Sequence, residues 1–408
     1  MNSNLSFPIP NSELPQGWHW VKLGEVCEVV TGATPRTDDP NNWDGEILWA
    51  TPNDMGKLRG YIIEDTERKI SHKGFESCST KLLPPGSILL TTRAPIGHLA
   101  INLKPMCTNQ GFKSLIPSSQ IHNWFLFFVL KYFVPVLQSM GRGQTFTEIS
   151  KGQVETFGIP LPPLPEQKRI ATRIQGSLQE VKHARTACEK QLEATKALPT
   201  AYLREVFESE ESKKWENRRL GEVCEIVTGS TPKTDDPSNW NGEILWATPN
   251  DMGKLREFTI EDTERKISQK GFESCSTKLL PPESVLLTTR APIGHLAINL
   301  KPMCTNQGFK SLIPTSKIYN WFLFFALKHF VPVLQSMGRG QTFTEISKGQ
   351  VETFEIPIPH HTEQYKIATY LKEKMAQVEN LQSAIRNQLS ALNTLPQAIL
   401  RQAFNGEL

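Results

Sequence analysis

The chain has 408 residues, which is too many for one ordinary domain, because a single hydrophobic core stops growing near roughly 250 to 300 residues. Hydrophobic residues make up 38% of it, including 20 Phe and 9 Trp, and this composition excludes a disordered protein. The 45 basic and 42 acidic residues leave a net charge of +3, so any basic surface for a nucleic-acid partner must be local.

The N-terminal residues lack the basic and apolar pattern of a secretory signal. The longest apolar run, residues 124–130, is far shorter than the ~20 residues that a membrane span needs. Seven cysteines are present, and no two have the C-x-x-C spacing typical of zinc sites. We therefore expect a cytoplasmic protein with reduced cysteines, no bound metal and no membrane association.

A direct repeat dominates the sequence. At an offset of 197 residues the chain aligns with itself without a gap, from Trp18 opposite Trp215 to Glu210 opposite Glu407. Residues 23–162 and 220–359 differ at 18 of 140 positions, whereas the residues that follow, up to 211 and 408, agree at only 17 of 49. The chain therefore consists of two copies of one unit.

In the near-identical part, turn-forming residues alternate with short β-rich runs. Residues 45–51 and 87–93 are predicted strands, and residues 94–97 a turn between two strands. Residues 120–140 are long and apolar enough for a buried helix, with Gly141 as its C-terminal cap. The pattern predicts a compact mixed α/β domain in each copy.

The divergent part predicts a long helix in each copy. Residues 166–197 span about 48 Å as a helix at 1.5 Å per residue. We expect the helices to stop near Pro199 and Pro396, because proline lacks the backbone donor. An apolar stripe with spacings of three and four, interrupted at Arg185 and Gln382, predicts that the two helices pair. The stripe consists of Ile174, Leu178, Val181, Cys188, Leu192, Leu371, Met375, Val378, Ile385, Leu389 and Leu392.

Several short strings occur in order along the chain. They are GW at residues 17–18, LGEV at 23–26, TTRAPIG at 91–97, TNQ at 108–110, PLPEQKRI at 163–170 and AILRQAF at 398–404. Together with the duplication and the long helices, they resemble the specificity subunits of type I restriction-modification systems over nearly the whole chain. The second copy departs at residues 359–364, PHHTEQ, where only the Glu363-Gln364 pair of the PLPEQ string remains.

The resemblance implies an α+β fold, in which two repeated mixed α/β target-recognition domains are separated by two long antiparallel helices that form a coiled-coil spacer. It implies a non-catalytic subunit without a cofactor. The partners would be double-stranded DNA, two methyltransferase subunits docked through the long helices, and restriction (translocase and nuclease) subunits joined through the complex. The expected divisions are a tail at 1–16, recognition domains at 17–162 and 214–359, a helix and linker at 163–213, and a second helix at 360–408.

Two other hypotheses stay open from the residues. Asp54, followed by Glu67 and Lys69, has the acidic and acidic-x-lysine pattern of metal-dependent nucleases. Residues 62–71 also alternate in charge as a solvated surface segment does. A DNA endonuclease built from two repeated domains is the main rival, and a structural adaptor without DNA contact is the third hypothesis. The sequence has no GK[ST] phosphate loop and no Asn-Pro-Pro-aromatic motif of adenine methyltransferases.

Side-chain chemistry selects candidate DNA contacts. Glycines beside Arg142 allow a close approach to phosphate, and Thr145 with Glu148 resembles a capping box, although an ordinary turn fits equally. Arg93 could bind guanine or form a structural ion pair. The side-chain amides could pair with adenine or cap turns. The lysines could contact phosphate or be exposed only to water. The candidates are Asn53, Lys57, Arg59, Lys73, Arg93, Asn109, Gln110, Arg142, Gln144, Thr145, Lys151, and their counterparts Asn250, Lys254, Arg256, Lys270, Arg290, Asn306, Gln307, Arg339, Gln341, Thr342 and Lys348.

Near-identical recognition domains should read near-identical half-sites. If the helices are antiparallel, the protein has an approximate two-fold axis and the target should be an interrupted palindrome. Four of the 18 differences could disturb this symmetry most. They are Gly60 to Glu257, His72 to Gln269, Gly86 to Glu283 and Gly158 to Glu355. We expect these four positions to lie away from the bases.

Overall fold

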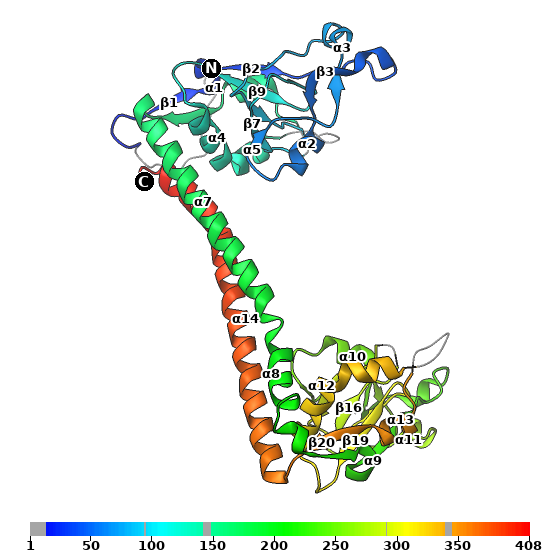
Figure 1. The fold of residues 1–408 in the computed structure, drawn as a ribbon. Helices are drawn as coiled ribbons and strands as arrows, with labels where there is room; N and C mark the ends of the chain where they lie inside the picture. The colour runs from blue at the N-terminus through cyan, green and yellow to red at the C-terminus, as the bar shows by residue number, and fades with distance from the viewer. Residues whose placement is uncertain (1–13, 94, 142–147, 291, 339–344) are drawn as a thin grey trace. The chain divides into compact units, whose positions relative to one another are not determined.

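The computed structural model describes residues 14–93, 95–141, 148–290, 292–338 and 345–408 (Figure 1). It divides into two compact units: unit 1 is Met1–Cys188 with Gln388–Leu408, and unit 2 is Glu189–Asn387. Each unit combines a mixed α/β part with segments of the long helices. The α+β class predicted from the sequence is confirmed.

The α/β part of unit 1 contains short strands and short helices. Its elements are β1 (His19–Lys22), α1 (Leu23–Val26), β2 (Cys27–Thr31), the 3₁₀ helix η1 (Pro40–Asn42), β3 (Trp43–Ala50), α2 (Pro52–Lys57), β4 (Ile62–Ile63), β5 (Lys69–Ile70), α3 (His72–Glu76), β6 (Ile88–Leu90), β7 (Leu99–Asn102), β8 (Cys107–Thr108), β9 (Lys113–Pro117), α4 (Asn123–Tyr132), α5 (Val134–Met140), α6 (Lys151–Glu155) and β10 (Gly158–Leu161).

Among its described residues, unit 2 repeats this order with two changes: α12 stands in place of α4 and α5, and the 3₁₀ helix η2 precedes the first strand. Its elements are η2 (Ser212–Lys214), β11 (Glu216–Arg219), α9 (Leu220–Val223), β12 (Cys224–Thr228), η3 (Pro237–Asn239), β13 (Trp240–Ala247), α10 (Pro249–Lys254), β14 (Thr259–Ile260), β15 (Lys266–Ile267), α11 (Gln269–Glu273), β16 (Val285–Leu287), β17 (Leu296–Asn299), β18 (Cys304–Thr305), β19 (Lys310–Pro314), α12 (Asn320–Met337), α13 (Lys348–Thr353) and β20 (Glu355–Ile358).

Three small sheets form each α/β part. In unit 1 the strand orders are β2-β9-β6-β7-β4, β5-β3-β8 and β1-β10, and unit 2 has the equivalent orders. The β1-β10 pair is antiparallel and places His19 opposite Leu161, so the start and end of the α/β part are joined. β4 with β7 and β3 with β8 are parallel pairs within otherwise antiparallel sheets.

Helix α4 packs against β6 and β7 and carries the aromatic core of unit 1. Phe125, Phe127 and Phe128 are fully buried, which explains why the helix is apolar on every side. Among the described residues no single helix has the length and hydropathy to cross a membrane; the bent pair α4 and α5 passes that test by length and composition only.

The prediction of one helix over residues 120–140 is wrong for the first copy. There α4 and α5 meet at an angle of 63°, with Pro135 in the first turn of α5. In the second copy α12 is a single helix with Pro332 inside it. Proline removes one backbone donor, so the same sequence pattern allows either a break or a continuous helix. Gly141 does occupy the C-cap position.

The long helices are α7 (Leu164–Thr195), α8 (Leu198–Phe207) and α14 (His361–Phe404) (Figure 1). In unit 1, Arg169 donates to the Leu408 carbonyl over 2.7 Å, and the Cys188 sulfur lies 3.9 Å from Gln388 Oε1. Residue numbers therefore increase along α7 in the same direction in which they decrease along α14. The pairing is antiparallel, as the sequence led us to expect.

Unit 2 has the same antiparallel arrangement between α8 and the start of α14. The Tyr370 hydroxyl lies 3.2 Å from the Glu205 carboxylate, and the Lys374 ammonium lies 5.5 Å from the centre of the Tyr202 ring. The side chains of the apolar stripe are buried or half-buried along both long helices. Ile174, Leu178, Leu371, Met375, Val378 and Ile385 are buried, and Val181, Cys188, Leu192, Leu389 and Leu392 are half-buried.

The two predicted helix ends had different outcomes. α7 ends at Thr195, and Pro199 then lies in the first turn of α8, where a missing donor costs little. The second helix does not stop at Pro396, because α14 continues to Phe404. Leu400 and Phe404 beyond the proline are buried in the unit 1 core. Their burial, roughly 1.5 to 3 kcal/mol for each side chain, compensates for the interrupted hydrogen bond.

A buried glutamine ties each long helix to its α/β part. Gln167 Oε1 accepts from the His122 backbone N–H over 2.8 Å, and its Nε2 donates to the carbonyls of Gln120 and Pro162. Gln364 makes the equivalent three bonds in unit 2. This role gives a physical reason why the glutamine of the PLPEQ string is present in both copies.

Candidate nucleic-acid interface

Five segments of unit 1 lie close together, and we call them the loop cluster. Hydrogen bonds join residues 109–111 to residues 32–36 and 91–93, and residues 51–57 to residues 65–69; the two groups meet where the Asn109 N–H donates to the Ala50 carbonyl over 3.1 Å. Residues 32–36 contact the end of β8, where the Ala33 N–H donates to the Thr108 carbonyl over 3.0 Å. A Cβ on Gly32 would lie 2.1 Å from the Asn109 carbonyl oxygen, so only glycine permits this approach. The cluster consists of residues 32–36, 51–57, 65–69, 91–93 and 109–111, with residues 229–233, 248–254, 262–266, 288–290 and 306–308 as its counterpart in unit 2.

The turn at residues 109–111 lies at the centre of the cluster. Asn109 Oδ1 accepts from the Gly111 N–H, so the amide caps its own turn. Gln110 Oε1 accepts from the Thr34 hydroxyl, and the Gly111 carbonyl accepts from the Thr92 N–H over 2.8 Å. Asn109, Gln110 and Arg93, which the sequence selected separately, are therefore neighbours.

The acidic residues of the nuclease hypothesis hold the cluster together. Asp54 Oδ2 accepts from the Thr51 N–H and hydroxyl in a capping box, and its Oδ1 accepts from the Glu67 N–H over 2.8 Å. The Glu67 carboxylate accepts from Asn53 over 2.9 Å and from Lys57 over 2.6 Å. The bond to Glu67 raises the pKa of Lys57. Both carboxylates therefore accept hydrogen bonds from local donors.

Lys69 of the same pattern pairs with Asp65 instead of pointing to Asp54. Throughout the described ranges, no three His, Cys, Asp or Glu side chains lie close enough together to hold a metal ion. Unit 2 repeats the bonds, with Glu264 accepting from Asn250 over 3.1 Å and from Lys254 over 2.5 Å. The geometry therefore favours a structural role for this acidic pattern.

Arg93 lies at the edge of the cluster in an ion-pair network. Its Nε donates to Glu148 over 2.9 Å, and the buried Lys113 ammonium lies 3.0 Å from the same carboxylate. Burial acts to raise the pKa of Glu148, but hydrogen bonds from Lys113 and Arg93 outweigh it and leave the pKa below its usual range. Of the capping box proposed for Thr145 and Glu148, Thr145 lies outside the described residues, and the Glu148 carboxylate accepts from Arg93 and Lys113. The helix that follows has Ser150 and Gln153 as its capping box.

The remaining candidates lie outside the cluster. Lys73 pairs with Asp39 over 2.8 Å and Lys151 with Glu155 over 3.5 Å, and Arg59 is exposed. In unit 2, Lys270 and Lys348 make the equivalent pairs with Asp236 and Glu352, and Arg256 is exposed. Arg290, which belongs to the unit 2 cluster, pairs with Glu345 as Arg93 pairs with Glu148. The candidates Arg142, Gln144, Thr145, Arg339, Gln341 and Thr342 lie outside the described residues.

Sequence reasoning missed Arg68, which we had assigned to a solvated segment. Its guanidinium lies 3.7 Å from the centre of the Trp43 ring, and Arg265 stacks on Trp240 at the same distance. The available signal was the pair of tryptophans six residues apart, with Trp49 on the predicted strand at residues 45–51 and Trp43 just before it. Their contact with Arg68 depends on a sheet pairing that no local pattern reveals.

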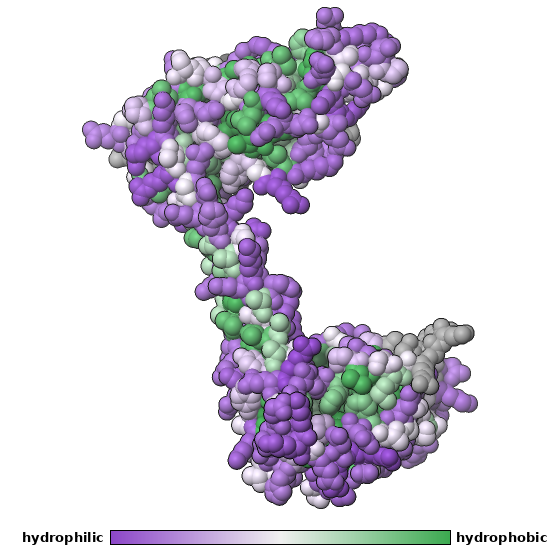
Figure 2. Space-filling view, viewed as in Figure 1, coloured by the Kyte–Doolittle hydropathy of each residue, from purple (hydrophilic) through white to green (hydrophobic). Residues whose placement is uncertain are grey.

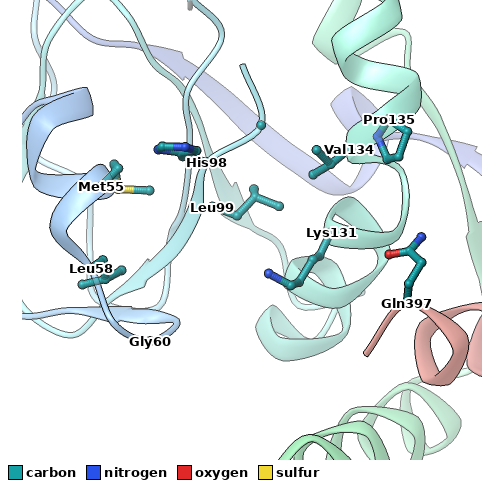
Figure 3. Close-up of a pocket in the computed structure, with 10 residues that line it drawn as sticks. Met55, Leu58, Gly60, His98, Leu99, Lys131, Val134, Pro135 and Gln397 are labelled. Carbon is teal, nitrogen blue, oxygen red and sulfur yellow. The ribbon is translucent and has the colours of Figure 1, made fainter. Parts of the chain in front are cut away.

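A cavity of about 350 Å³ lies elsewhere in unit 1 (Figure 3). Met55, Leu58 and His98 line one side, and Lys131 and Gln397 lie across from them. Burial lowers the pKa of Lys131. None of the candidate DNA contacts lines this cavity. Most of the visible surface is hydrophilic, with apolar side chains gathered in limited areas (Figure 2).

The chain matches the model of a known protein family. The family model for the type I restriction modification DNA specificity domain matches residues 15–187 and again residues 212–391. The chain belongs to this family. The specificity subunit of the type I restriction enzyme MjaIX from Methanocaldococcus jannaschii is 26% identical, over 97% of this chain and 94% of that protein. The resemblance found in the short strings is therefore confirmed.

Two solved structures share the fold. The HsdS subunit from Thermoanaerobacter tengcongensis has a TM-score of 0.73 at 26% identity, over 98% of this chain and 99% of that one. A chain from a structure describing complex assembly and conformational transition of the type I R-M system has a TM-score of 0.70 at 27% identity, over 97% and 100%. This chain is a specificity subunit and not an enzyme; the enzymatic activities belong to partner subunits.

Proposed function

We propose that this specificity subunit reads a bipartite DNA target, one half with each α/β part, and that residues 17–162 and 214–359 are the recognition domains. The loop cluster carries this proposal. It differs between the copies only at Ala33 and Arg36, which are Ser230 and Lys233 in the second. The two clusters also repeat their hydrogen bonds, so they offer DNA nearly the same donors and acceptors.

The target should be an interrupted palindrome. The helix segments pair antiparallel in each unit, and we expect equal half-sites to be read on opposite strands. Of the four disruptive differences, Gly60, His72, Gly86 and Gly158, none belongs to the loop cluster. In unit 2, Glu355 at the last of these positions pairs with Arg219, which reduces its repulsion of phosphate.

The long helices at residues 163–213 and 360–408 are the proposed docking sites for two methyltransferase subunits, through which restriction subunits join the complex. The helices would set the length of the unread gap between half-sites. Because the proposed target is double-stranded DNA, we expect the complex to work in the cytoplasm. Binding should fall steeply with salt, because Lys and Arg contacts displace counterions from phosphate.

Genome-wide mapping of methylated adenines tests the proposal. The expected result is a bipartite motif whose halves are inverted copies, lost when the gene for this chain is deleted. A motif with unrelated halves would contradict the palindrome and leave DNA reading intact. Magnesium-dependent cleavage of DNA by the purified chain alone would favour the endonuclease, and the absence of any DNA binding, with or without methyltransferase, would favour the structural adaptor.

A further inference from the structure

Arg68 is fixed in place at an exposed position of the loop cluster. Its guanidinium carbon lies 3.7 Å from the centre of the Trp43 ring and 5.5 Å from that of Trp49. The two rings pack edge to face with centroids 5.1 Å apart. The Arg68 carbonyl accepts from the Trp49 N–H over 3.3 Å and from the Thr66 hydroxyl over 2.7 Å. Both the backbone and the side chain are thus restrained.

The tryptophans are held by main-chain acceptors. Trp43 Nε1 donates to the Arg36 carbonyl over 3.2 Å, and Trp49 Nε1 donates to the Ala33 carbonyl over 3.0 Å. Ala33 and Arg36 are the two cluster positions that change in the second copy. Because each contributes a carbonyl to these bonds, replacement of its side chain leaves them possible.

Unit 2 reproduces the arrangement. The Trp240 and Trp246 indoles donate to the carbonyls of Lys233 and Ser230 over 3.3 and 3.0 Å. The Arg265 guanidinium lies 3.7 and 5.4 Å from the two ring centres. The geometry therefore survives the only substitutions that the cluster contains.

The positive charge of Arg68 is not neutralised by its neighbours. Asp65 pairs with Lys69 at 3.5 Å, and Glu67 pairs with Lys57 at 2.6 Å. Within the described ranges, no carboxylate forms an ion pair with Arg68 or Arg265. Arg93, in contrast, is already bound to Glu148. Stacking on an aromatic face leaves the in-plane N–H donors of a guanidinium open to a ligand.

We infer that Arg68 and Arg265 are specificity-determining residues, each binding the edge of one guanine in its own half-site. This inference rests on the proposed function, because it requires that the loop clusters contact DNA. The planar guanidinium matches the O6 and N7 acceptors of guanine in the major groove. Since Trp43 and Trp240 restrain its orientation, the guanidinium discriminates against a base whose acceptors are placed differently.

The test uses the full chain assembled with its methyltransferase subunits. After the target is mapped, binding is measured to the intact duplex and to duplexes in which each guanine is replaced in one half only. For the unaltered complex, we expect replacement of the bound guanine in either half to weaken binding roughly ten- to a hundredfold. Arg68→Ala should make the complex indifferent to that replacement in one half and leave it sensitive in the other.

Arg265→Ala should abolish the sensitivity to guanine replacement in the other half-site and keep it in the first. The double variant should be insensitive to guanine replacement in both half-sites. Arg68→Lys should behave like Arg68→Ala, because lysine keeps the charge but lacks the planar pair of donors. Lys81→Ala is the matched control: it removes an exposed cation that pairs with Glu28 in the same unit, and the preference for guanine should stay unchanged.

Three results would overturn the inference. One is a mapped half-site without a G·C pair, and another is an Arg68→Ala complex that still discriminates in both halves. The third is an equal loss of affinity for target and non-target DNA, which identifies a phosphate contact. Failure of the unaltered complex to bind DNA would instead reject the proposed function.

Discussion

The loop clusters and the long-helix segments were duplicated together, yet they have changed to very different extents. The parts that contain the clusters keep 122 of 140 positions in the second copy, whereas the helix parts keep 17 of 49. In the cluster, individual side chains make specific bonds, such as Glu67 with Asn53 and Lys57. In the helices, the copies share mainly an apolar stripe and a buried glutamine.

This difference shows which physical requirement acts on each region. A surface that presents donors and acceptors depends on the identity and orientation of each residue. A helix pair depends on the apolar character of a few positions, so Ile174 can become Leu371 and Leu178 can become Met375 and stay buried. Substitutions that respect or violate these requirements test the comparison.

The largest effect should come from creating a cavity in the stripe. Ile174 is fully buried, and we expect Ile174→Ala to lower the free energy of unfolding of unit 1 by about 3 kcal/mol, from lost transfer energy and the cavity. Leu395→Ala is the control, because Leu395 is 40% exposed and should cost under ~1 kcal/mol. Urea unfolding combined with hydrogen exchange checks both values. Equal effects would show that the stripe does not stabilise the pairing.

The buried glutamine should rank next. Gln167→Leu removes three hydrogen bonds and leaves the His122 N–H and two carbonyls without that partner, so we expect a loss of about 2 kcal/mol. Faster amide exchange at His122 and in the first turn of α7 would show the local opening. Gln179→Leu, at an exposed position of the same helix, should leave exchange unchanged. Unchanged exchange in Gln167→Leu would mean that the anchor is dispensable.

Glu148 tests the edge of the loop cluster. Glu148→Gln leaves the buried Lys113 without its carboxylate, and we expect a loss of roughly 2 kcal/mol, below the 3 to 5 of a fully buried pair because Glu148 is partly exposed. Thermal unfolding measures the loss. Glu28→Gln, which removes an exposed pair with Lys81, should change stability by under ~0.5 kcal/mol. A similar small change for both variants would contradict a structural role for Glu148.

The same residue predicts a pH dependence. The folded-state pKa of Glu148 lies below its usual value of 4.5, so its stabilisation is present above pH 4.5 and is lost as the pH falls through the lower folded-state pKa. The difference in stability between the unaltered chain and Glu148→Gln should therefore be constant near neutral pH and shrink below pH 4.5. Denaturant unfolding over this acid range measures it. A difference that stays constant there would show that this carboxylate is not linked to stability.

The two prolines should give the smallest effects. Pro396 lies inside α14, and Pro396→Ala should stabilise unit 1 by about 1 kcal/mol because it restores one backbone hydrogen bond. Pro199→Ala is the matched change in the first turn of α8, where no bond is missing, and its effect should be near zero. Melting temperatures of the two variants compare them directly. A larger gain from Pro199→Ala would reverse our account of both positions.

Much of the molecule follows from local sequence patterns. The duplication and the apolar stripe require only spacing along the chain, and they predicted the two copies and the pairing of the long helices. The α+β class and the antiparallel direction of the pair were implied by the family resemblance. The prolines show where such patterns fail. Pro199 and Pro396 occupy equivalent positions, but one lies in the first turn of a new helix and the other lies inside a helix. The apolar residues that follow are buried in both copies, Leu203 and Phe207 in unit 2 and Leu400 and Phe404 in unit 1, so their burial does not account for the difference.

The sequence by itself also determined the family and the chemical types from which a DNA-reading surface could be built. Only the tertiary structure decided which of those residues meet. Thr34 and Gln110 are 76 positions apart and bond within the loop cluster, and Arg93 and Glu148 are 55 apart and bond at its edge. Arg68 stacks on Trp43 through the pairing of β5 with β3. Side-chain type is local information, whereas contact depends on long-range strand pairing, which brings distant segments together only when the whole domain folds.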